Sequence, residues 1–119
     1  MEVPEVPNTP KTHKELVTMF AKQYNVSERD MVAVIECETA GTWDTNIQSY
    51  VKYNFSSAKR GIIKGDRERS YGLSQIHLPD HPYITISEAK DATYSIEFMA
   101  RAFSKGKQGW WSCYNNMYK

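Results

Sequence analysis

The sequence predicts a single, mainly helical domain with a small irregular or β-hairpin lobe. Its 119 residues are 40% hydrophobic and 13% aromatic, which is enough for one modest core but not for two. Apolar residues recur at helical spacing in three segments, residues 12–24, 27–38 and 87–104. Between residues 44 and 69, Gly, Asn, Ser and Asp interrupt the apolar pattern, as in a short hairpin or an irregular lobe.

The chain is expected to divide into an extended N-terminal arm over residues 1–11 and one folded domain over residues 12–119. The arm is rich in Pro and Glu and shows no apolar periodicity. It also lacks the basic start and the apolar stretch of a signal peptide, and no apolar run in the chain is long enough to span a membrane. We therefore expect a monomer without a membrane span.

The charge balance argues against a nucleic-acid partner. Fifteen Lys and Arg against fourteen Asp and Glu leave a formal net charge of +1, far from the basic footprint typical of nucleic-acid binding. Residues 21–28 join two predicted helices much as a helix-turn-helix does, which keeps a DNA-binding protein as an alternative. The second of these helices is too apolar to offer enough polar or basic side chains to bases and phosphates. We therefore expect no nucleic-acid partner.

The second predicted helix is unusually apolar and ends at a carboxyl group. Ser27, with Asp30 three residues later, resembles a capping box and opens this helix. Gly41 ends it soon after Glu38. Its apolar residues are Met31, Val32, Val34 and Ile35. A helix of this composition is expected to be central, so Glu38 stands at the edge of the core.

The C-terminal half is expected to contain further helices. Residues 74–78 read as a brief helix that Pro79 ends. Residues 87–104 read as one long helix, with Gly106 as its stop. The apolar residues that give this segment its helical spacing are Ala92, Ile96, Met99, Ala100 and Phe103. The aromatic-rich residues 109–119 begin a last helix or turn.

Glu38 is the first candidate for chemistry. A carboxyl group at the edge of an apolar helix is poorly solvated, which favours its neutral form, so it can lend a proton to a glycosidic oxygen near neutral pH. Downstream, the segment 70–76 and the pair Tyr114-Asn115 would supply the opposite wall of a cleft. Without those segments, an ordinary solvated residue at a helix end is the simpler interpretation. Glu36, which is nearly opposite on the helix, is expected to be structural or exposed.

With these segments, the chain resembles the lysozyme-like superfamily in its bacterial lytic transglycosylase and goose-type lysozyme branch. That family places its catalytic glutamate at a helix end before Ser or Thr, as in Glu38-Thr39. Ser49, six residues after Trp43, matches the position of a cleft serine. The family's Gly-Leu-Met-Gln block corresponds to Gly72-Leu73-Ser74-Gln75, and its Ala-Tyr-Asn block to Cys113-Tyr114-Asn115. The resemblance covers nearly everything from Met31 to Asn115, and implies an α+β lysozyme-like fold.

The resemblance implies a peptidoglycan-degrading muramidase. Such an enzyme cleaves the β-1,4 bond between N-acetylmuramic acid and N-acetylglucosamine, here with Glu38 as general acid and base and with peptidoglycan glycan strands as the partner. Goose-type lysozymes add a carboxylate in a Gly-Asp-Arg segment, which makes Asp66 the candidate second catalytic residue and Glu68 a weaker one. If Asp66 holds a water molecule, the enzyme is a lysozyme. If not, the muramic acid 6-hydroxyl attacks and leaves the anhydro end of a lytic transglycosylase.

The remaining matched residues are expected to bind substrate. Ser49 and Gln75 would hydrogen-bond sugar or N-acetyl groups. Tyr114 would orient the catalytic carboxyl group, and Asn115 would support that wall. Tyr71 is a candidate aromatic face for a sugar ring. The resemblance implies that the protein acts in the cell envelope, either on its periplasmic or extracellular side or after delivery by a phage. A catalytically inactive glycan-binding module is the alternative function within this fold.

The two cysteines leave two possibilities open. Cys37 and Cys113 each stand one residue before a candidate site residue. If Glu38 and Tyr114 meet across a cleft, the two thiols can approach closely enough for a disulfide, which would indicate an oxidising compartment. Otherwise they are two small buried residues with free thiols.

The histidines suggest a metal site only weakly. His77 and His81 have the separation of helical metal ligands, but Pro79 between them breaks a helix. A third ligand at a supporting spacing is not apparent in the sequence. We therefore expect no metal and no other cofactor.

Overall fold

The computed structural model describes residues 12–118, so the expected N-terminal arm lies outside the described residues. Five α-helices lie in this range: α1 (His13–Tyr24), α2 (Glu28–Glu38), α3 (Ile86–Lys90), α4 (Ala92–Ser104) and α5 (Ser112–Met117). One short antiparallel pair, β1 (Ser70–Tyr71) and β2 (Ile76–His77), forms the sheet, and two 3-10 turns follow, η1 (Leu78–Asp80) and η2 (Gln108–Trp110). The predicted class, mainly helical with a small β lobe, is confirmed.

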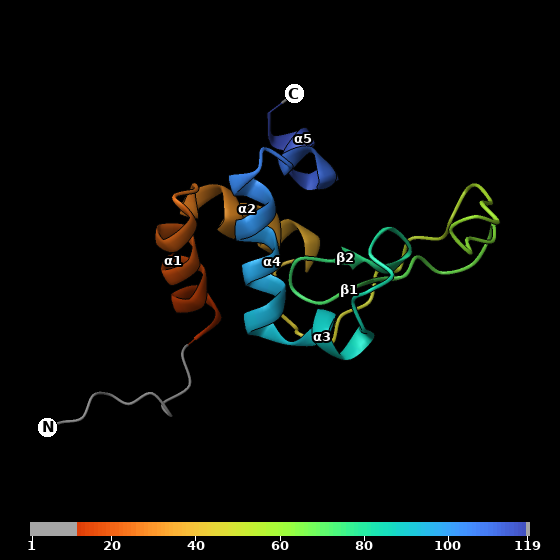
Figure 1. Cartoon of the computed structure of the whole chain (residues 1–119), viewed down its shortest axis with the longest axis horizontal. Coiled ribbons are helices and arrows are strands. Elements are labelled where there is room, and N and C mark those ends of the chain that lie inside the picture. The colour runs from red at the N-terminus through yellow and green to blue at the C-terminus, as the bar shows by residue number, and fades with distance from the viewer. Residues whose placement is uncertain (1–11, 119) are drawn as a thin grey trace, which may run out of the picture.

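The core lies between the long helices. Helix α1 packs against both α2 and α4, and α5 packs against α2 (Figure 1). The main buried cluster contains Leu16, Val17, Phe20, Met31, Val34, Ile35, Leu73, Ile96, Met99, Phe103 and Trp111. A smaller cluster joins the sheet to α3 and contains Tyr71, Ile76, Ile84 and Ala89. Helix α2 is therefore central, as its apolar composition predicts, and its apolar face is occupied by the core.

Helix α2 begins and ends where the sequence predicts. The backbone N–H of Asp30 donates to the Ser27 hydroxyl oxygen over 3.1 Å, which caps the first turn. The last helical residue is Glu38. Gly41 then takes a φ of 78°, and the Thr39 hydroxyl donates to a carbonyl of the last turn over 2.8 Å. The chain thus leaves the helix directly after the carboxyl group.

The predicted helix over residues 74–78 is wrong. Gln75 takes a left-handed φ of 51°, which turns the chain back and brings Ile76–His77 into register with Ser70–Tyr71. Pro79 lies inside the 3-10 turn η1 and does not end a helix. A segment this short carries too little periodicity to separate a helix from a strand, and here pairing across the turn decides the outcome.

The predicted helix over residues 87–104 is divided in two. Asp91 has φ −75° and ψ 125°, which is extended backbone, so α3 ends and α4 begins at this residue. Its carboxylate accepts a hydrogen bond from the backbone N–H of Tyr94 over 2.8 Å and caps α4. Gly106 follows α4 with a φ of 75°, in agreement with the expected stop.

Gly72 marks the closest approach of the sheet to the helices. Its φ is 81°, and a Cβ added there would lie 1.9 Å from the carbonyl oxygen of Ala89 in α3. Its backbone N–H donates to the carbonyl of Ile47 over 2.9 Å. Only glycine fits this position without moving one of the two backbones.

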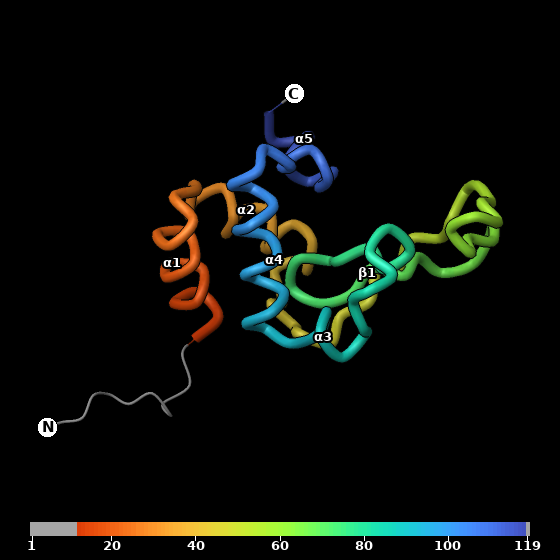
Figure 2. The backbone as a smooth tube through the Cα atoms, viewed as in Figure 1, coloured from red at the N-terminus to blue at the C-terminus, as the bar shows by residue number. Residues whose placement is uncertain are grey.

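The segment from about residue 48 to residue 67 forms the irregular lobe that the sequence predicts. In the tube view it projects away from the helices (Figure 2). Isolated bridges hold it together and attach it to β1, namely Gln48 with Tyr71, Lys52 with Arg67, and Ser57 with Ile62. The lobe therefore behaves as a loose hairpin that starts at the sheet.

A chain of polar contacts anchors this lobe to β2 and η1. The hydroxyl group of Tyr53 lies 2.7 Å from His77 Nε2. His77 Nδ1 lies 2.9 Å from one carboxylate oxygen of Asp80, and an Arg60 nitrogen lies 2.6 Å from the other. His77 and Asp80 are thus occupied in holding the lobe, and the negative charge of Asp80 has its partners within the fold.

Candidate active site

Glu38 has the electrostatic character of a proton donor that works near neutral pH. Its carboxyl group is partly buried, and burial is the main reason that its pKa rises from the ordinary 4.5 to about 7. The negative charge of Glu68 raises it further, while a hydrogen bond from the backbone of Cys113 favours the ionised form and opposes the change. The neutral acid is therefore well populated at neutral pH, as expected for a carboxyl group at the edge of an apolar helix.

Three segments that are distant in sequence meet at this carboxyl group. Helix α2 supplies Glu38, the base of the lobe supplies Glu68, and the first turn of α5 supplies the backbone of Cys113. Glu68 is held in place on both its backbone and its side chain. Its carbonyl oxygen accepts from the Gln48 side chain over 3.2 Å, and its carboxylate accepts from the Ser70 hydroxyl over 3.2 Å. The acid thus faces a second carboxylate that is anchored to β1.

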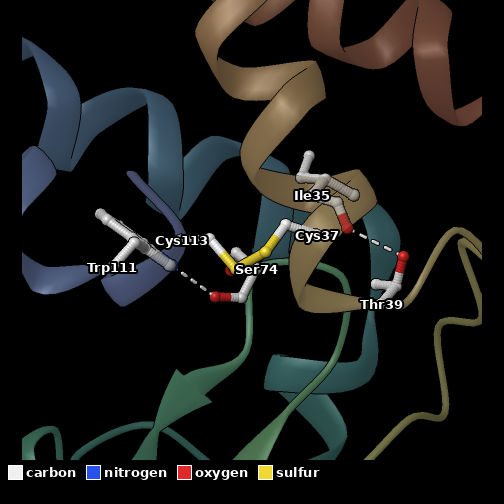
Figure 3. Close-up of a disulfide and its surroundings, with 6 residues drawn as sticks. All are labelled: Ile35, Cys37, Thr39, Ser74, Trp111 and Cys113. Atoms are coloured by element: carbon white, nitrogen blue, oxygen red, sulfur yellow. Dashed lines mark hydrogen bonds between the residues drawn. A yellow bond between two sulfur atoms is a disulfide. The ribbon is translucent and has the colours of Figure 1, made fainter. Parts of the chain in front are cut away.

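The start of α5 is tied to both walls of the site. A disulfide joins Cys37 to Cys113, with their Cα atoms 6.1 Å apart (Figure 3). Next to it, the indole N–H of Trp111 donates to the Ser74 carbonyl over 2.6 Å. Of the two possibilities that the sequence leaves open for the cysteines, the structure shows the disulfide. The Cys113 backbone is therefore constrained against α2 and against the turn between β1 and β2.

Gln75 and Ser49 lie on opposite sides of β1 in sequence, and both bind backbone groups there. The Gln75 amide nitrogen donates to the carbonyl oxygens of Gly72, over 2.9 Å, and Ile47, over 3.3 Å. The Ser49 backbone N–H donates to the Ser70 carbonyl over 3.0 Å. These contacts support the turn and the base of the lobe, and the sugar-binding roles of both side chains stay predictions.

Asp66 lies further out on the lobe than Glu68. Its side chain is exposed, and its backbone carbonyl accepts from the N–H of Tyr53 over 2.8 Å within the hairpin. Among residues 12–118, Glu68 is the carboxylate whose charge raises the pKa of Glu38. The catalytic role predicted for Asp66 stays a prediction, and the structure brings the weaker candidate into electrostatic contact with the acid.

Two of the matched tyrosines are packed into the protein. Tyr71 is 8% exposed and belongs to the smaller core cluster, with the Lys90 ammonium group 5.6 Å from its ring centroid. The ring of Tyr114 contacts those of Phe103 and Tyr118, with centroids 5.8 and 4.9 Å away. The contact from this segment to the acid comes from the backbone of the preceding cysteine, a contact that no side-chain motif reveals.

Asn115 hydrogen-bonds the segment that precedes α5. Its side-chain nitrogen donates to the Gly109 carbonyl over 3.0 Å, and its backbone N–H donates to the Trp111 carbonyl over 3.1 Å. The supporting role expected for Asn115 on that wall stays a prediction. The side chain itself is exposed.

A cavity of about 240 Å³ opens beside Gln75. Its lining comprises Gln75, Ile76, His77, Asp80, His81, Phe98, Trp110 and Trp111. Trp111 is 4% exposed and is a core residue, whereas Trp110 is 54% exposed at the rim. The cavity adds His81, Phe98 and Trp110 to the candidate residues.

Comparisons of this chain with protein-family models, with curated proteins and with solved structures found no match. Within residues 12–118, no group of three or more His, Cys, Asp or Glu side chains is placed to hold a metal ion. No helix in the same range is long and apolar enough to cross a membrane. The function of this chain is therefore inferred from the geometry of the site.

Proposed function

We propose that this protein is a peptidoglycan-degrading muramidase in which Glu38 acts as general acid and base. One observation carries the proposal: a partly buried carboxyl group at the end of α2, with a pKa of about 7, faces a second carboxylate. A catalytic acid is most effective when its pKa lies near the working pH, because it is then able both to donate and to recover a proton. Glycosidases use such pairs of carboxyl groups in different ionisation states.

In the proposed reaction, Glu38 donates its proton to the oxygen that joins N-acetylmuramic acid to N-acetylglucosamine. Positive charge then develops on the anomeric carbon of the muramic acid. The ionised Glu38 that remains is stabilised by the backbone hydrogen bond from Cys113. It then accepts a proton from the attacking group, which is a water molecule in a lysozyme or the sugar's own 6-hydroxyl group in a transglycosylase.

The second carboxylate determines which group attacks. A carboxylate that holds a water molecule against the opposite face of the sugar leads to hydrolysis. We rank Glu68 ahead of Asp66 for this role, because its charge acts on Glu38 and its position is fixed by β1. Mass spectrometry of the products separates the two outcomes, since anhydro-muramic ends report transglycosylation and reducing ends report hydrolysis.

We place the glycan strand along the cavity beside Gln75, whose lining does not itself include Glu38 or Glu68. It presents one amide side chain and the exposed indole of Trp110, and saccharide sites commonly combine an aromatic face with a few polar groups. The disulfide supports action in an oxidising compartment, such as the outer side of a cell envelope.

The decisive test is turnover of purified peptidoglycan by the Glu38→Gln variant. We expect activity to fall by roughly 10²- to 10⁴-fold, the range for loss of a general acid, while the fold persists. Glu36→Gln is the matched control, because that carboxylate lies on the same helix and pairs with Lys14 over 3.7 Å at the surface. Near-normal turnover by Glu38→Gln would contradict the proposal, and binding of glycan without turnover by the native protein would support an inactive glycan-binding module.

In a hydrolase, Glu68→Gln should lower turnover much more than Asp66→Asn does. The reason is that Glu68 is the carboxylate in electrostatic contact with Glu38. The reverse order would restore Asp66 as the partner. Equal and small effects of both changes, together with anhydro products, would indicate a transglycosylase.

A further inference from the structure

We propose that a second pocket, which also has Trp110 in its lining, binds the carboxylate groups carried by muramic acid. This inference extends the proposed function, since it assigns a recognition site for one of the two sugars in the strand. The pocket has a volume of about 300 Å³ and is formed by α4, the turn after it and the segment before α3. It combines aromatic side chains with three cationic ones.

The aromatic part of this pocket is open to solvent. Trp110 is 54% exposed and Tyr83 is 73% exposed. The rings of Phe98 and Trp110 are stacked with centroids 6.1 Å apart, and the ring of His81 meets that of Phe98 edge-on at 5.0 Å. Rigid rings of this kind offer flat apolar faces at a low entropic cost, which suits the faces of sugar rings.

The cationic part comes from the end of α4 and the turn that follows. Arg101, Lys105 and Lys107 line the pocket, and the sequence contains no Asp or Glu from residue 98 to residue 119. The nearest acid in sequence, Glu97, lies 3.4 Å from Arg101 and accepts a 2.7 Å hydrogen bond from a tyrosine of α1. Within residues 12–118, Lys105 and Lys107 form no ion pair, so their charge is available to a ligand.

The two pockets share one aromatic strip. His81, Phe98 and Trp110 line both the cavity beside Gln75 and the second pocket. A strand lying in the first cavity that continues over Trp110 therefore reaches the lysines. N-acetylglucosamine carries no charge, whereas muramic acid carries a carboxylate on its lactyl group or, when that group bears a peptide, on the peptide. The charge pattern thus selects the acidic sugar.

The test is ligand binding to the Glu38→Gln protein, which should not degrade its ligands. Three probes are compared: an N-acetylglucosamine hexamer, peptidoglycan strands stripped of peptides, and strands that keep their peptides. We expect the Lys105→Ala/Lys107→Ala double change to weaken binding of the acidic strands by roughly tenfold and to leave the neutral hexamer unaffected. Lys22→Ala/Lys64→Ala is the matched control for net charge, because both of these lysines are exposed and lie elsewhere.

The pattern of losses identifies the carboxylate. A loss with stripped strands assigns the lactyl carboxylate, and a loss only with peptide-bearing strands assigns the peptide. An equal loss for the hexamer, or no loss for either acidic strand, would overturn the inference. These binding results do not depend on turnover. If the native protein does not degrade peptidoglycan but the lysine double change still weakens binding as expected, the proposed reaction is refuted and the proposed carboxylate-binding pocket is supported.

A Trp110→Ala variant tests the aromatic strip separately. It should weaken binding of all three probes, including the neutral hexamer, because the ring contacts sugars regardless of charge. Unchanged binding of the hexamer would show that the glycan does not cross this residue, and would remove the link between the two pockets.

Discussion

Replacing Glu38 by glutamine is expected to stabilise the fold at alkaline pH while it removes activity. In the unfolded chain the carboxyl group ionises near its ordinary pKa of 4.5, whereas in the folded protein it ionises near 7. The folded state therefore holds the proton more tightly than the unfolded state does. Below pH 4.5 both states are protonated and folding carries no penalty from this group. As the pH rises through 4.5 and on to 7, the penalty grows to its full size.

The size of this penalty follows from the two pKa values. Each tenfold difference in proton affinity corresponds to about 1.4 kcal/mol, so a pKa of 4.5 in the unfolded chain and about 7 in the folded one implies roughly 3 kcal/mol. Partial exposure of the carboxyl group reduces this to about 2 to 3 kcal/mol. Glutamine has nearly the same shape and stays neutral, so the variant avoids the penalty.

Urea unfolding at pH 4 and at pH 8 measures the effect. The free energy of unfolding of Glu38→Gln should match that of the native protein at pH 4 and exceed it by about 2 to 3 kcal/mol at pH 8. The control, Glu36→Gln, loses only a surface ion pair with Lys14, which is worth about 0 to 1 kcal/mol. The free energies of unfolding of Glu38→Gln and the native protein could instead differ by the same amount at both pH values. That result would mean that burial does not raise the pKa of Glu38, and it would contradict the proposed catalytic role of this residue.

Three further changes test the supports of the site. Glu68→Gln removes a charge that raises the pKa of Glu38, so the alkaline limb of the pH–activity profile should move to lower pH, and an unmoved limb would contradict the contact. Replacing Cys37 and Cys113 together by serine should lower the free energy of unfolding in urea by about 2 to 4 kcal/mol, because the disulfide joins positions 76 residues apart. Gly72→Ala should cost on the order of 3 kcal/mol or prevent folding, since its Cβ would lie 1.9 Å from a carbonyl oxygen of α3, and a native-like thermal melt would refute this packing.

The long helices could be predicted because local rules and packing agree in them. Apolar residues recur on one face of α2, and the Ser27 cap and the Gly41 stop bracket it in the sequence. The division between α3 and α4 was missed because the apolar spacing continues across it. Only the cap formed by Asp91 breaks the helix there, and an aspartate inside a periodic segment is a weak signal.

The candidate site was predictable only as far as side-chain motifs extend. Glu38 could be identified from its helix end and its apolar surroundings, but no pattern specifies which backbone N–H reaches it, and that group belongs to Cys113. The choice between Asp66 and Glu68 also depends on which carboxylate lies close enough to Glu38 in the folded chain. The two residues are two positions apart in sequence, and Asp66 lies at a bend next to the bridge between Lys52 and Arg67. Glu68, which is nearer the sheet, is the one whose charge reaches the acid.

A carboxyl group with a pKa near 7 must be held in place, because its burial opposes folding above pH 4.5. The Cys37–Cys113 disulfide provides that hold by fixing the first turn of α5 against the end of α2. Loosening α5 would have two opposite effects on Glu38: loss of the backbone hydrogen bond raises the pKa, and entry of water lowers it. Burial is the larger cause of the present pKa, so water entry decides the sign. Reduction of the disulfide should thus return the pKa of Glu38 toward 4.5 and deprive the site of its neutral acid at pH 7, even while the helices remain folded.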